Sequence, residues 1–209
     1  MRLFLTGTDT NVGKTYVASR LVRALRKAGL DCVGMKPICC GERADAEELH
    51  AACGSAISLN DVNPVWLRTP AAPYTAAIVE NRAIDLALIR ETFARLRATH
   101  DSIIVEGVGG WRVPIARDYF VSDLAAEFAL PVGVVVANQL GAINHTLLTV
   151  ESIRAAGLQC AGIILNALSA PPGDSVAVAT NRSMLEDLCG VPVLFDLAHG
   201  QSELALGIA

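Results

Sequence analysis

The sequence predicts an α/β fold made of one domain, residues 1–209, with a doubly wound, mainly parallel sheet and helices on both faces. Three observations predict it. Short apolar runs alternate with longer stretches of helical periodicity, which is the pattern of successive βαβ units. Hydrophobic residues make up 52% of the chain, as expected when strands are buried on both faces. A loop bounded by glycines joins the first apolar run to the first helical stretch.

The strands are predicted where apolar runs are short and bounded by polar residues or glycine. In chain order we expect them at Leu3–Thr6, Cys32–Met35, Ser102–Val105, Val132–Ala137, Ala161–Leu165 and Val193–Phe195. Ligands of such sheets bind at the carboxyl ends of the strands. Candidate functional residues are therefore expected immediately after each strand.

The helices are predicted between these strands, at Tyr16–Ala28, Ala46–Ala52, Ile84–Ala98, Ser122–Phe128, Ile143–Ala156 and Ser175–Leu188. The first and the fifth are followed by Gly29 and Gly157, and glycine is the common residue after a last helical turn. Residues Asn60–Ala83 are rich in proline and alanine and form the least regular segment. This segment is either a loop on the substrate side or a long connection.

Charge and hydropathy limit the classes of partner. The formal net charge of −4 and the pI of about 5.5 argue against a nucleic-acid partner. The N-terminus lacks the pattern of a secretory signal, and the longest apolar segment, near Phe128–Ala137, is too short to span a bilayer. We expect a soluble, cytoplasmic protein with no membrane partner. The six cysteines form no C-x-x-C pair, so we expect reduced thiols.

The loop after the first strand reads Gly7-Thr8-Asp9-Thr10-Asn11-Val12-Gly13-Lys14-Thr15. Its backbone N–H groups and the open start of the next helix favour an anion, as in a phosphate-binding loop. Lys14 adds positive charge for the outer phosphates, and the Thr15 hydroxyl is placed to ligate Mg²⁺. The common pattern has its first glycine where Thr8 stands, one step after Gly7. The alternative is a strand-to-helix turn without a ligand.

Two charged residues directly follow strands. Lys36, after the second strand, can reach the same crevice as Lys14, and two ammonium groups would suit phosphate transfer. The alternative is a surface lysine that ends a strand. Glu106, after the third strand, is a candidate metal ligand, and the glycines that follow it, such as Gly109, would let backbone approach a ligand. The alternative is a strand end followed by a flexible turn.

Three further positions each allow two interpretations. Asp45 is either a helix cap, forming a capping box with Glu48, or a second carboxylate for Mg²⁺. Gly141–Asn144 opens a helix whose N–H groups could hold a carboxylate, or it is an ordinary helix start with Asn144 near the cap. Asn166 offers the donor and acceptor that an adenine edge requires, or it forms a turn before Pro171-Pro172-Gly173.

Four segments, taken in order, carry a family resemblance: Gly7–Thr15, Lys36-Pro37, Val105-Glu106-Gly107-Val108-Gly109-Gly110-Trp111 and Leu140-Gly141-Ala142-Ile143-Asn144-His145. Together they resemble the dethiobiotin synthetases, enzymes of biotin synthesis. The match runs from the N-terminus past residue 145, and a looser match continues to about Val193. The phosphate loop of that family has the same glycine spacing as this one.

The resemblance implies a homodimer in which each chain is one phosphate-loop, ATP-dependent ligase domain with a seven-stranded parallel sheet. It implies conversion of 7,8-diaminopelargonate, CO₂ or bicarbonate, and Mg²⁺-ATP to dethiobiotin, ADP and phosphate. In the family one substrate amine captures CO₂ as a carbamate, which attacks the γ-phosphate to give a mixed anhydride. The second amine then closes the cyclic urea and expels phosphate.

The resemblance also implies roles for individual residues. Lys14, Lys36 and Thr10 would be catalytic and would stabilise charge on the carbamate and phosphates. The residues implied to bind ATP are Asp9, Thr10, Asn11, Val12, Gly13, Lys14, Thr15, Glu106 and Asn166. Those implied to hold Mg²⁺ are Thr15, Asp45 and Glu106. Those implied to contact the substrate are Lys36, Cys40, Gly109, Gly141, Ile143 and Asn144, the last three near the dimer interface.

Two departures from the family and two rival classes complete the prediction. The family usually has a hydroxyl residue where Cys40 stands, and a thiol is a weaker donor, so lower substrate affinity is expected. The usual Gly-x-x-Pro-like turn after the last strand is replaced by Phe195–Ala198, which bears on nucleotide preference. An amide-forming enzyme of the cobyrinate-synthase type would need an additional amidotransferase domain. A switch ATPase that positions plasmids or septa would carry a lysine early in the loop. This chain has Thr8-Asp9-Thr10 there, which argues against that class.

Overall fold

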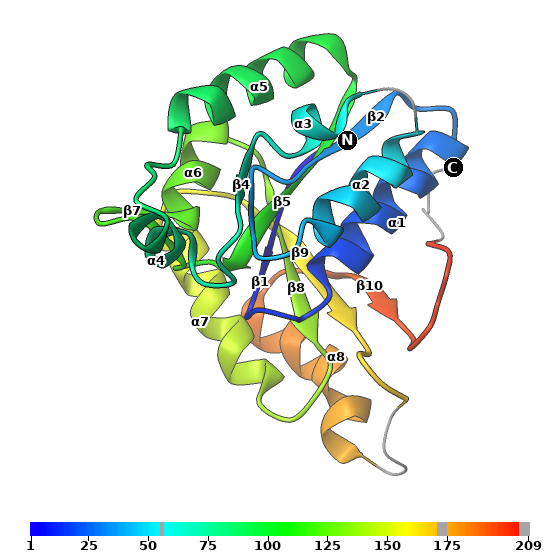
Figure 1. The fold of residues 1–209 in the computed structure, drawn as a ribbon. Helices are drawn as coiled ribbons and strands as arrows, with labels where there is room; N and C mark the ends of the chain where they lie inside the picture. The colour runs from blue at the N-terminus through cyan, green and yellow to red at the C-terminus, as the bar shows by residue number, and fades with distance from the viewer. Residues whose placement is uncertain (55–56, 171–174, 205–209) are drawn as a thin grey trace.

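In the computed structural model, which describes residues 1–54, 57–170 and 175–204, six strands form one parallel sheet (Figure 1). The sheet order is β10-β9-β8-β1-β5-β2, so β8, β9 and β10 follow one another outward on one side of β1, while β5 lies between β1 and the edge strand β2 on the other. The strands are β1 (Arg2–Gly7), β2 (Cys32–Met35), β5 (Ser102–Gly110), β8 (Val132–Ala137), β9 (Cys160–Asn166) and β10 (Val193–Leu197). The predicted α/β class with a doubly wound sheet is confirmed.

Helices cover both faces of this sheet (Figure 1). They are α1 (Lys14–Lys27), α2 (Ala44–Cys53), α5 (Leu86–Thr99), α6 (Val121–Phe128), α7 (Ala142–Ala155) and α8 (Val176–Cys189). α1 and α2 pack against each other and against β2 on one face, and α7 packs against β8 and α8 on the other. Among the described helices, none combines the length and the hydropathy needed to cross a bilayer.

The predicted ends of these elements hold to within two residues, with one exception. β5, predicted to end at Val105, continues to Gly110. There Gly110 pairs with Gly7 of β1 in the sheet register. The pairing of the two strands thus continues beyond Glu106, after a register shift between Leu5 and Gly7. Glu106 therefore lies within β5, opposite Leu5 of β1 and close to the start of the phosphate loop.

The family resemblance implies seven strands in the sheet, and this number is wrong for the described residues, where the main sheet has six. β3 (Ile38–Cys40) leaves the main sheet and pairs in parallel with β4 (Val65–Leu67), while β6 (Pro114–Ala116) and β7 (Tyr119–Phe120) form a small antiparallel pair. β2 ends two residues before Pro37, which has no N–H to donate to a continuing ladder. The chain turns there, and β3 extends over the carboxyl edge of the sheet.

The segment Asn60–Ala83 is more regular than predicted. It contains most of α3 (Leu59–Val62), then β4 and α4 (Pro73–Val79). α3 begins with a capping box between Ser58 and Asp61, and α4 has Pro73 in its first turn. The capping box and the N-terminal proline each mark a helix of only four or seven residues, so they are hard to recognise in a segment rich in proline and alanine. The segment is thus held in a defined position beside β3.

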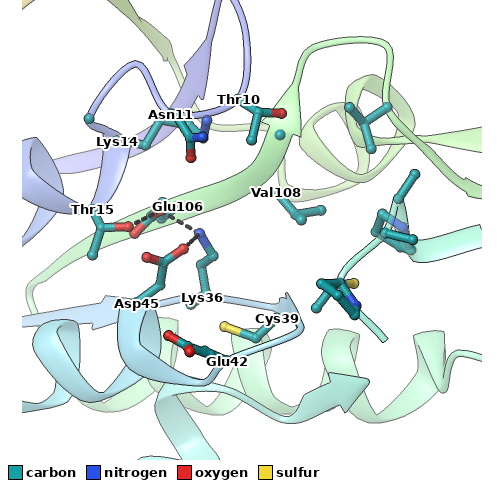
Figure 2. A pocket seen from close by; sticks show the side chains of 18 residues that line it. Thr10, Asn11, Lys14, Thr15, Lys36, Cys39, Glu42, Asp45, Glu106 and Val108 are labelled. Carbon is teal, nitrogen blue, oxygen red and sulfur yellow. Dashed lines mark hydrogen bonds and ion pairs between the residues drawn. The ribbon is translucent and has the colours of Figure 1, made fainter. Parts of the chain in front are cut away.

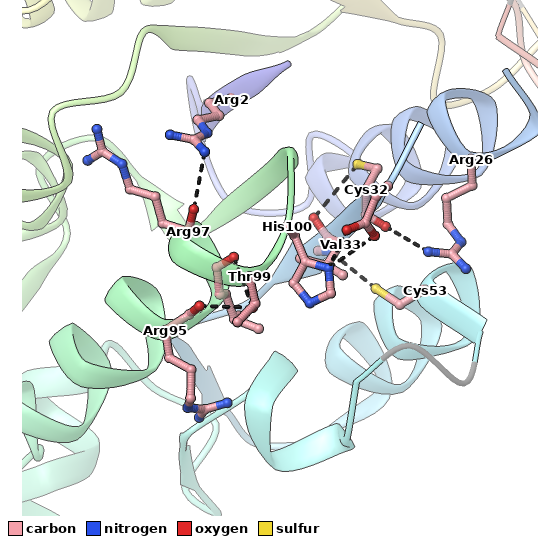
Figure 3. Close-up of polar contacts among 12 residues, drawn as sticks. Arg2, Arg26, Cys32, Val33, Cys53, Arg95, Arg97, Thr99 and His100 are labelled. Carbon is pink, nitrogen blue, oxygen red and sulfur yellow. Dashed lines mark hydrogen bonds and ion pairs between the residues drawn. The ribbon is translucent and has the colours of Figure 1, made fainter. Parts of the chain in front are cut away.

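Polar contacts at the amino end of the sheet fix the helix ends to the strands (Figure 3). Arg2 donates from Nη2 to the Arg97 carbonyl at 3.1 Å, which ties β1 to α5. His100 Nδ1 lies 3.0 Å from both Asp31 carboxylate oxygens, just before β2. The contacts at this end of the sheet stabilise the fold. The candidate functional residues lie at the opposite end, where the strands have their carboxyl ends.

Gly34 of β2 determines how closely α2 approaches the sheet. A Cβ at this position would lie 2.5 Å from the Leu49 Cγ and Cδ1 atoms. We therefore expect Gly34→Ala to lower the free energy of unfolding by about 2 kcal/mol through overpacking, measured by urea denaturation. In the double variant with Leu49→Ala the space is open, so the two changes should together cost less than their sum. Simple additivity would contradict the proposed contact.

Candidate active site

The loop between β1 and α1 depends on left-handed backbone conformations. Asn11 has a φ of 59° and Gly13 a φ of 90°. A Cβ on Gly13 would lie 2.1 Å from Asn166 Nδ2, so only glycine fits beside that amide. Gly13 is also the N-cap of α1 and has no side chain to bind the first helical N–H groups. These donors stay directed at the loop, which is the arrangement that binds an anion.

Lys14 lies across the loop and is not extended into solvent. Its Nζ donates to the Asp9 carbonyl at 2.9 Å, and the residue is only 6% exposed. Burial, together with the positive charge of Lys36, lowers the pKa of Lys14 to about 8. A phosphate oxygen beside Nζ would oppose both effects, because a neighbouring anion favours the charged ammonium. The loop and Lys14 are therefore suited to the same anionic ligand.

Lys36 joins two carboxylates at the end of the sheet (Figure 2). Its Nζ donates to Asp45 Oδ2 at 2.9 Å and to Glu106 Oε1 at 2.5 Å. Thr15 Oγ1 donates to the same Glu106 oxygen at 2.7 Å. Four residues from α1, α2, β5 and the turn after β2 thus meet at one point. The sequence predicted each of them separately.

Burial makes this cluster electrostatically strong. Lys36 is 3% exposed and Glu106 is 1% exposed. Burial disfavours the Lys36 ammonium, but the charges of Glu106 and Asp45 outweigh it, so the Lys36 pKa is raised. Burial raises the pKa of Glu106, and the Lys36 charge opposes that shift. The alternative of a surface lysine ending a strand is wrong, because Lys36 is enclosed.

The interpretation of Asp45 as a helix cap is also wrong. α2 begins one residue earlier, at Ala44, and its N-cap Arg43 makes no side-chain cap. The Asp45 carboxylate turns toward Lys36, and Glu48 accepts a hydrogen bond from Ser19 at 2.7 Å and not from the start of its own helix. The buried ammonium outcompetes local capping because a charge-assisted bond is the stronger one.

The oxygen atoms of Thr15, Asp45 and Glu106 fit a hard divalent cation such as Mg²⁺. Within the described part of the chain, Glu106 Oε2 is buried and has no hydrogen-bond partner. A buried carboxylate oxygen without a partner is costly, and a cation at that point would satisfy it. The three residues could therefore hold Mg²⁺, which would place it next to the phosphate loop.

The cluster lies at the bottom of a cavity of about 680 Å³. The predicted residues that line it are Thr10, Asn11, Gly13, Lys14, Thr15, Lys36, Cys40, Asp45, Glu106 and Gly109. One side of the cavity carries the phosphate loop and the charged cluster. The other side carries Cys40, with a pKa raised to about 11 by burial, and apolar residues. The cavity can thus hold a charged group and an alkyl chain side by side.

Other predicted site residues lie outside this cavity. Val12 packs into the core, and Asp9 accepts the Thr10 N–H through Oδ1 at 2.7 Å. Asn166 is buried at the end of β9, where Nδ2 donates to the Val12 carbonyl at 3.0 Å. It is therefore a strand residue and not part of a turn, and Pro171–Gly173 lie outside the described residues. The structure brings Asn166 to the loop.

The start of α7 is separate from the cavity of its own chain. Gly141 is the N-cap, with a φ of 93° and no side-chain cap bond, and Asn144 lies in the first turn, so both interpretations of this helix start stay open. Gly141 and Asn144 are exposed, and Ile143 is half-buried. A contact of these residues with the ligand would require a second chain.

Several lining residues were missed by the sequence interpretation: Cys39, Glu42, Pro70, Ala71, Ala72, Pro73, Val108 and Val113. Pro70–Pro73 belong to the segment for which a substrate-side loop was one of two alternatives, and their position agrees with that alternative. Cys39 and Val108 could have been noted as neighbours of Cys40 and Gly109. No sequence signal pointed to Glu42, which belongs to the turn between β3 and α2.

Comparisons with known proteins agree with this geometry. A family model described as an AAA domain matches residues 1–199. A relative from Akkermansia muciniphila, named ATP-dependent dethiobiotin synthetase BioD, is 46% identical over 209 residues, which are 100% of this chain and 97% of the relative. A relative of the same name from Aromatoleum aromaticum is 48% identical over 171 residues, which are 78% of this chain and 76% of the relative.

A solved structure is similar in fold. The signal recognition particle 54 kDa protein from Aeropyrum pernix K1, in complex with GDP, has a TM-score of 0.61 at 14% identity, over 98% of this chain and 43% of that one. Sheet order, loop and neighbour together define a phosphate-loop protein of the α/β class. Within that class, the relatives narrow the assignment. This chain belongs to the dethiobiotin synthetase family.

Proposed function

We propose that this chain uses Mg²⁺-ATP and CO₂ to convert 7,8-diaminopelargonate to dethiobiotin, ADP and phosphate. The observation that carries the proposal is the enclosed Lys36 ammonium beside Lys14, at a cavity that also contains the phosphate loop. Two ammonium groups at one place suit a reaction between a carbamate and a phosphoryl group, since both are anionic. Family membership supports the same reaction.

The proposed roles follow from position. Lys14, Thr10 and the N–H groups from Asp9 to Thr15 bind the phosphates, and Asn166 is the expected contact for the base. Lys36 holds the carbamate against the γ-phosphate, where a mixed anhydride forms. The second amine then attacks the anhydride carbonyl, closes the ring and expels phosphate. Mg²⁺, held by Thr15, Asp45 and Glu106, would neutralise phosphate charge when bound.

The two sides of the cavity support a substrate with a charged end and an alkyl chain. Carbamate and phosphate chemistry would occur beside Lys36. The alkyl chain would lie against the wall formed by Cys40, Val108 and Pro70–Pro73. Gly109 has a φ of 61°, and a Cβ there would lie 2.7 Å from Val113 Cγ2, so backbone forms this part of the wall.

The test is ADP release from purified protein with Mg²⁺-ATP and bicarbonate, with and without 7,8-diaminopelargonate. We expect release to depend on the diamine and a product with the mass of dethiobiotin to appear. Release without the diamine that rises with a protein or DNA partner would instead support the switch-ATPase alternative. The variant Lys27→Ala, an exposed lysine on α1, should behave as wild type in this assay.

Cys40→Ser tests the wall of the cavity. A hydroxyl donates better hydrogen bonds than a thiol, so we expect the KM for the diamine to fall or to stay unchanged. The neighbouring Cys39→Ser is the contrast, because Cys39 is 2% exposed and its replacement buries a hydroxyl and lowers stability. A large rise in KM for Cys40→Ser, with normal melting, would mean that Cys40 does not stand at the position where the family has its substrate-binding hydroxyl residue.

We also propose that the chain acts as a homodimer, with Gly141–Asn144 of each chain directed at the substrate carboxylate of its partner. The support is an apolar surface at and before α7, where Leu140 is 86% exposed and Leu148 is 59% exposed. Light scattering should give the mass of two chains. A monomer with full activity would contradict the shared site. The cytoplasmic location stays a prediction.

A further inference from the structure

The chain after β10 forms a turn that is braced by one side chain, Gln201. The Gln201 N–H donates to the Ala198 carbonyl at 3.1 Å, and the Ala198 N–H donates to Gln201 Oε1 at 3.1 Å. Gln201 Nε2 donates to the Glu203 carbonyl at 2.9 Å. The side chain thus closes the turn Ala198–Gln201 on one side and fixes the next residues on the other.

α1 binds this turn through two donors. The Tyr16 hydroxyl and Arg20 Nε both donate to the Gln201 carbonyl, the latter at 3.0 Å. The Arg20 guanidinium lies over the Tyr16 ring, 3.2 Å from its centroid, and Nη1 donates to the Tyr16 carbonyl. The two side chains therefore support each other. Leu204, three residues beyond the turn, is 8% exposed and joins the core.

The turn lies next to the phosphate loop from two directions. On one side, Tyr16 follows Thr15 in the first turn of α1. On the other, the Leu197 carbonyl at the end of β10 accepts the Ala167 N–H at 2.9 Å, and the adjacent Asn166 binds the Val12 carbonyl of the loop. The turn is thus connected to both elements that border the loop. Asn166, the proposed contact for the base, therefore lies between the loop and this turn.

We propose that Tyr16 and Arg20, acting through Gln201, are positioning residues that hold the turn Ala198–Gln201 as the wall for the nucleoside part of ATP. This inference rests on the proposed use of ATP. The donors come from the helix that begins at the phosphate loop, so the wall and the loop keep a fixed spacing. Tyr16 and Arg20 contact the turn and not the phosphates. Their loss should weaken binding of the base and leave binding of the polyphosphate intact.

The test compares two probes on Tyr16→Phe/Arg20→Ala by calorimetry without the diamine. We expect the Kd for Mg²⁺-ATP to rise about tenfold, since two hydrogen bonds that hold the wall are lost. The Kd for Mg²⁺-tripolyphosphate, which has no nucleoside, should change by less than about twofold. An unchanged ATP affinity, or an equal loss for both probes, would overturn the proposal.

Two further variants separate positioning from charge and from stability. Arg23→Ala removes the same charge from α1 and the same weak contact with Glu48, at 4.0 Å against 3.8 Å for Arg20, so it should bind ATP as wild type. Gln201→Ala removes the brace from the other side and should repeat the selective loss of affinity for ATP.

In turnover assays of these variants, KM for ATP should rise while kcat and KM for the diamine stay constant. If wild-type protein binds ATP but makes no dethiobiotin, the proposed function is refuted. The comparison of ATP and tripolyphosphate binding would still test the role of Tyr16 and Arg20.

Discussion

Lys14→Ala is expected to abolish turnover, with kcat/KM for ATP lowered by about a thousandfold, while the fold remains intact. The Lys14 ammonium lies inside the loop at 2.9 Å from the Asp9 carbonyl, and the proposed function places the outer phosphates beside it. A preorganised charge at a developing anion commonly contributes a factor of about a hundred to a thousand. The measurement is ADP release in the presence of the diamine.

Thermal melting and a control complete this experiment. Lys14→Ala should melt near the wild-type temperature, because the side chain binds only one carbonyl in the described structure. Lys27→Ala removes a lysine from the last turn of the same helix and should keep full activity. Activity of Lys14→Ala above about a tenth of wild type, with normal melting, would rule out the phosphate-loop assignment.

Lys36→Met is expected to remove activity and also to lower the free energy of unfolding, by about 3 kcal/mol, at neutral pH. The reason is that Glu106 stays buried without its counter-ion, and breaking one side of a buried pair is strongly destabilising. The measurement is urea denaturation of the variant and of Lys36→Met/Glu106→Gln. The double variant has no unpaired buried charge, so it should regain part of the lost stability.

The loss should also depend on pH, with a sign that follows from burial. Burial raises the pKa of Glu106 in the folded state above the value of about 4.3 for an unfolded glutamate. Without Lys36, the folded state therefore binds its proton more tightly than the unfolded state does. The penalty is absent below the unfolded pKa and grows as pH rises toward the folded one. A loss that is the same at acidic and neutral pH would indicate lost packing and not charge.

The sheet was predictable because its signals are local. β2 and β8 were predicted at their observed bounds, since apolar runs between polar residues define a buried strand. β3 and β4 were not, because each has three residues, and a short strand is defined by its partner and not by its own sequence. The count of seven strands was implied by the family resemblance and not by a local signal of this sequence, and the main sheet has six.

The charged cluster was predictable in its members and not in its contacts. The ends of the predicted strands identified Lys36 and Glu106, although β5 continues past Glu106 to Gly110. Local sequence favoured a cap for Asp45, and only the folded chain shows that Lys36 takes that carboxylate instead. The Gln201 turn was not foreseen, because two donors from α1 meet a backbone carbonyl 181 or more residues away. No sequence pattern encodes such a contact.

The most direct test of the central claim is to follow the carbon of ¹³C-bicarbonate during turnover with Mg²⁺-ATP and 7,8-diaminopelargonate. The proposed reaction predicts that the label enters the ring carbonyl of dethiobiotin, with ADP released in equal amount to product. Mass spectrometry of the product and an ADP assay on the same sample give both quantities. ADP formed without labelled product would contradict the account and would leave a phosphate-loop ATPase with a different partner.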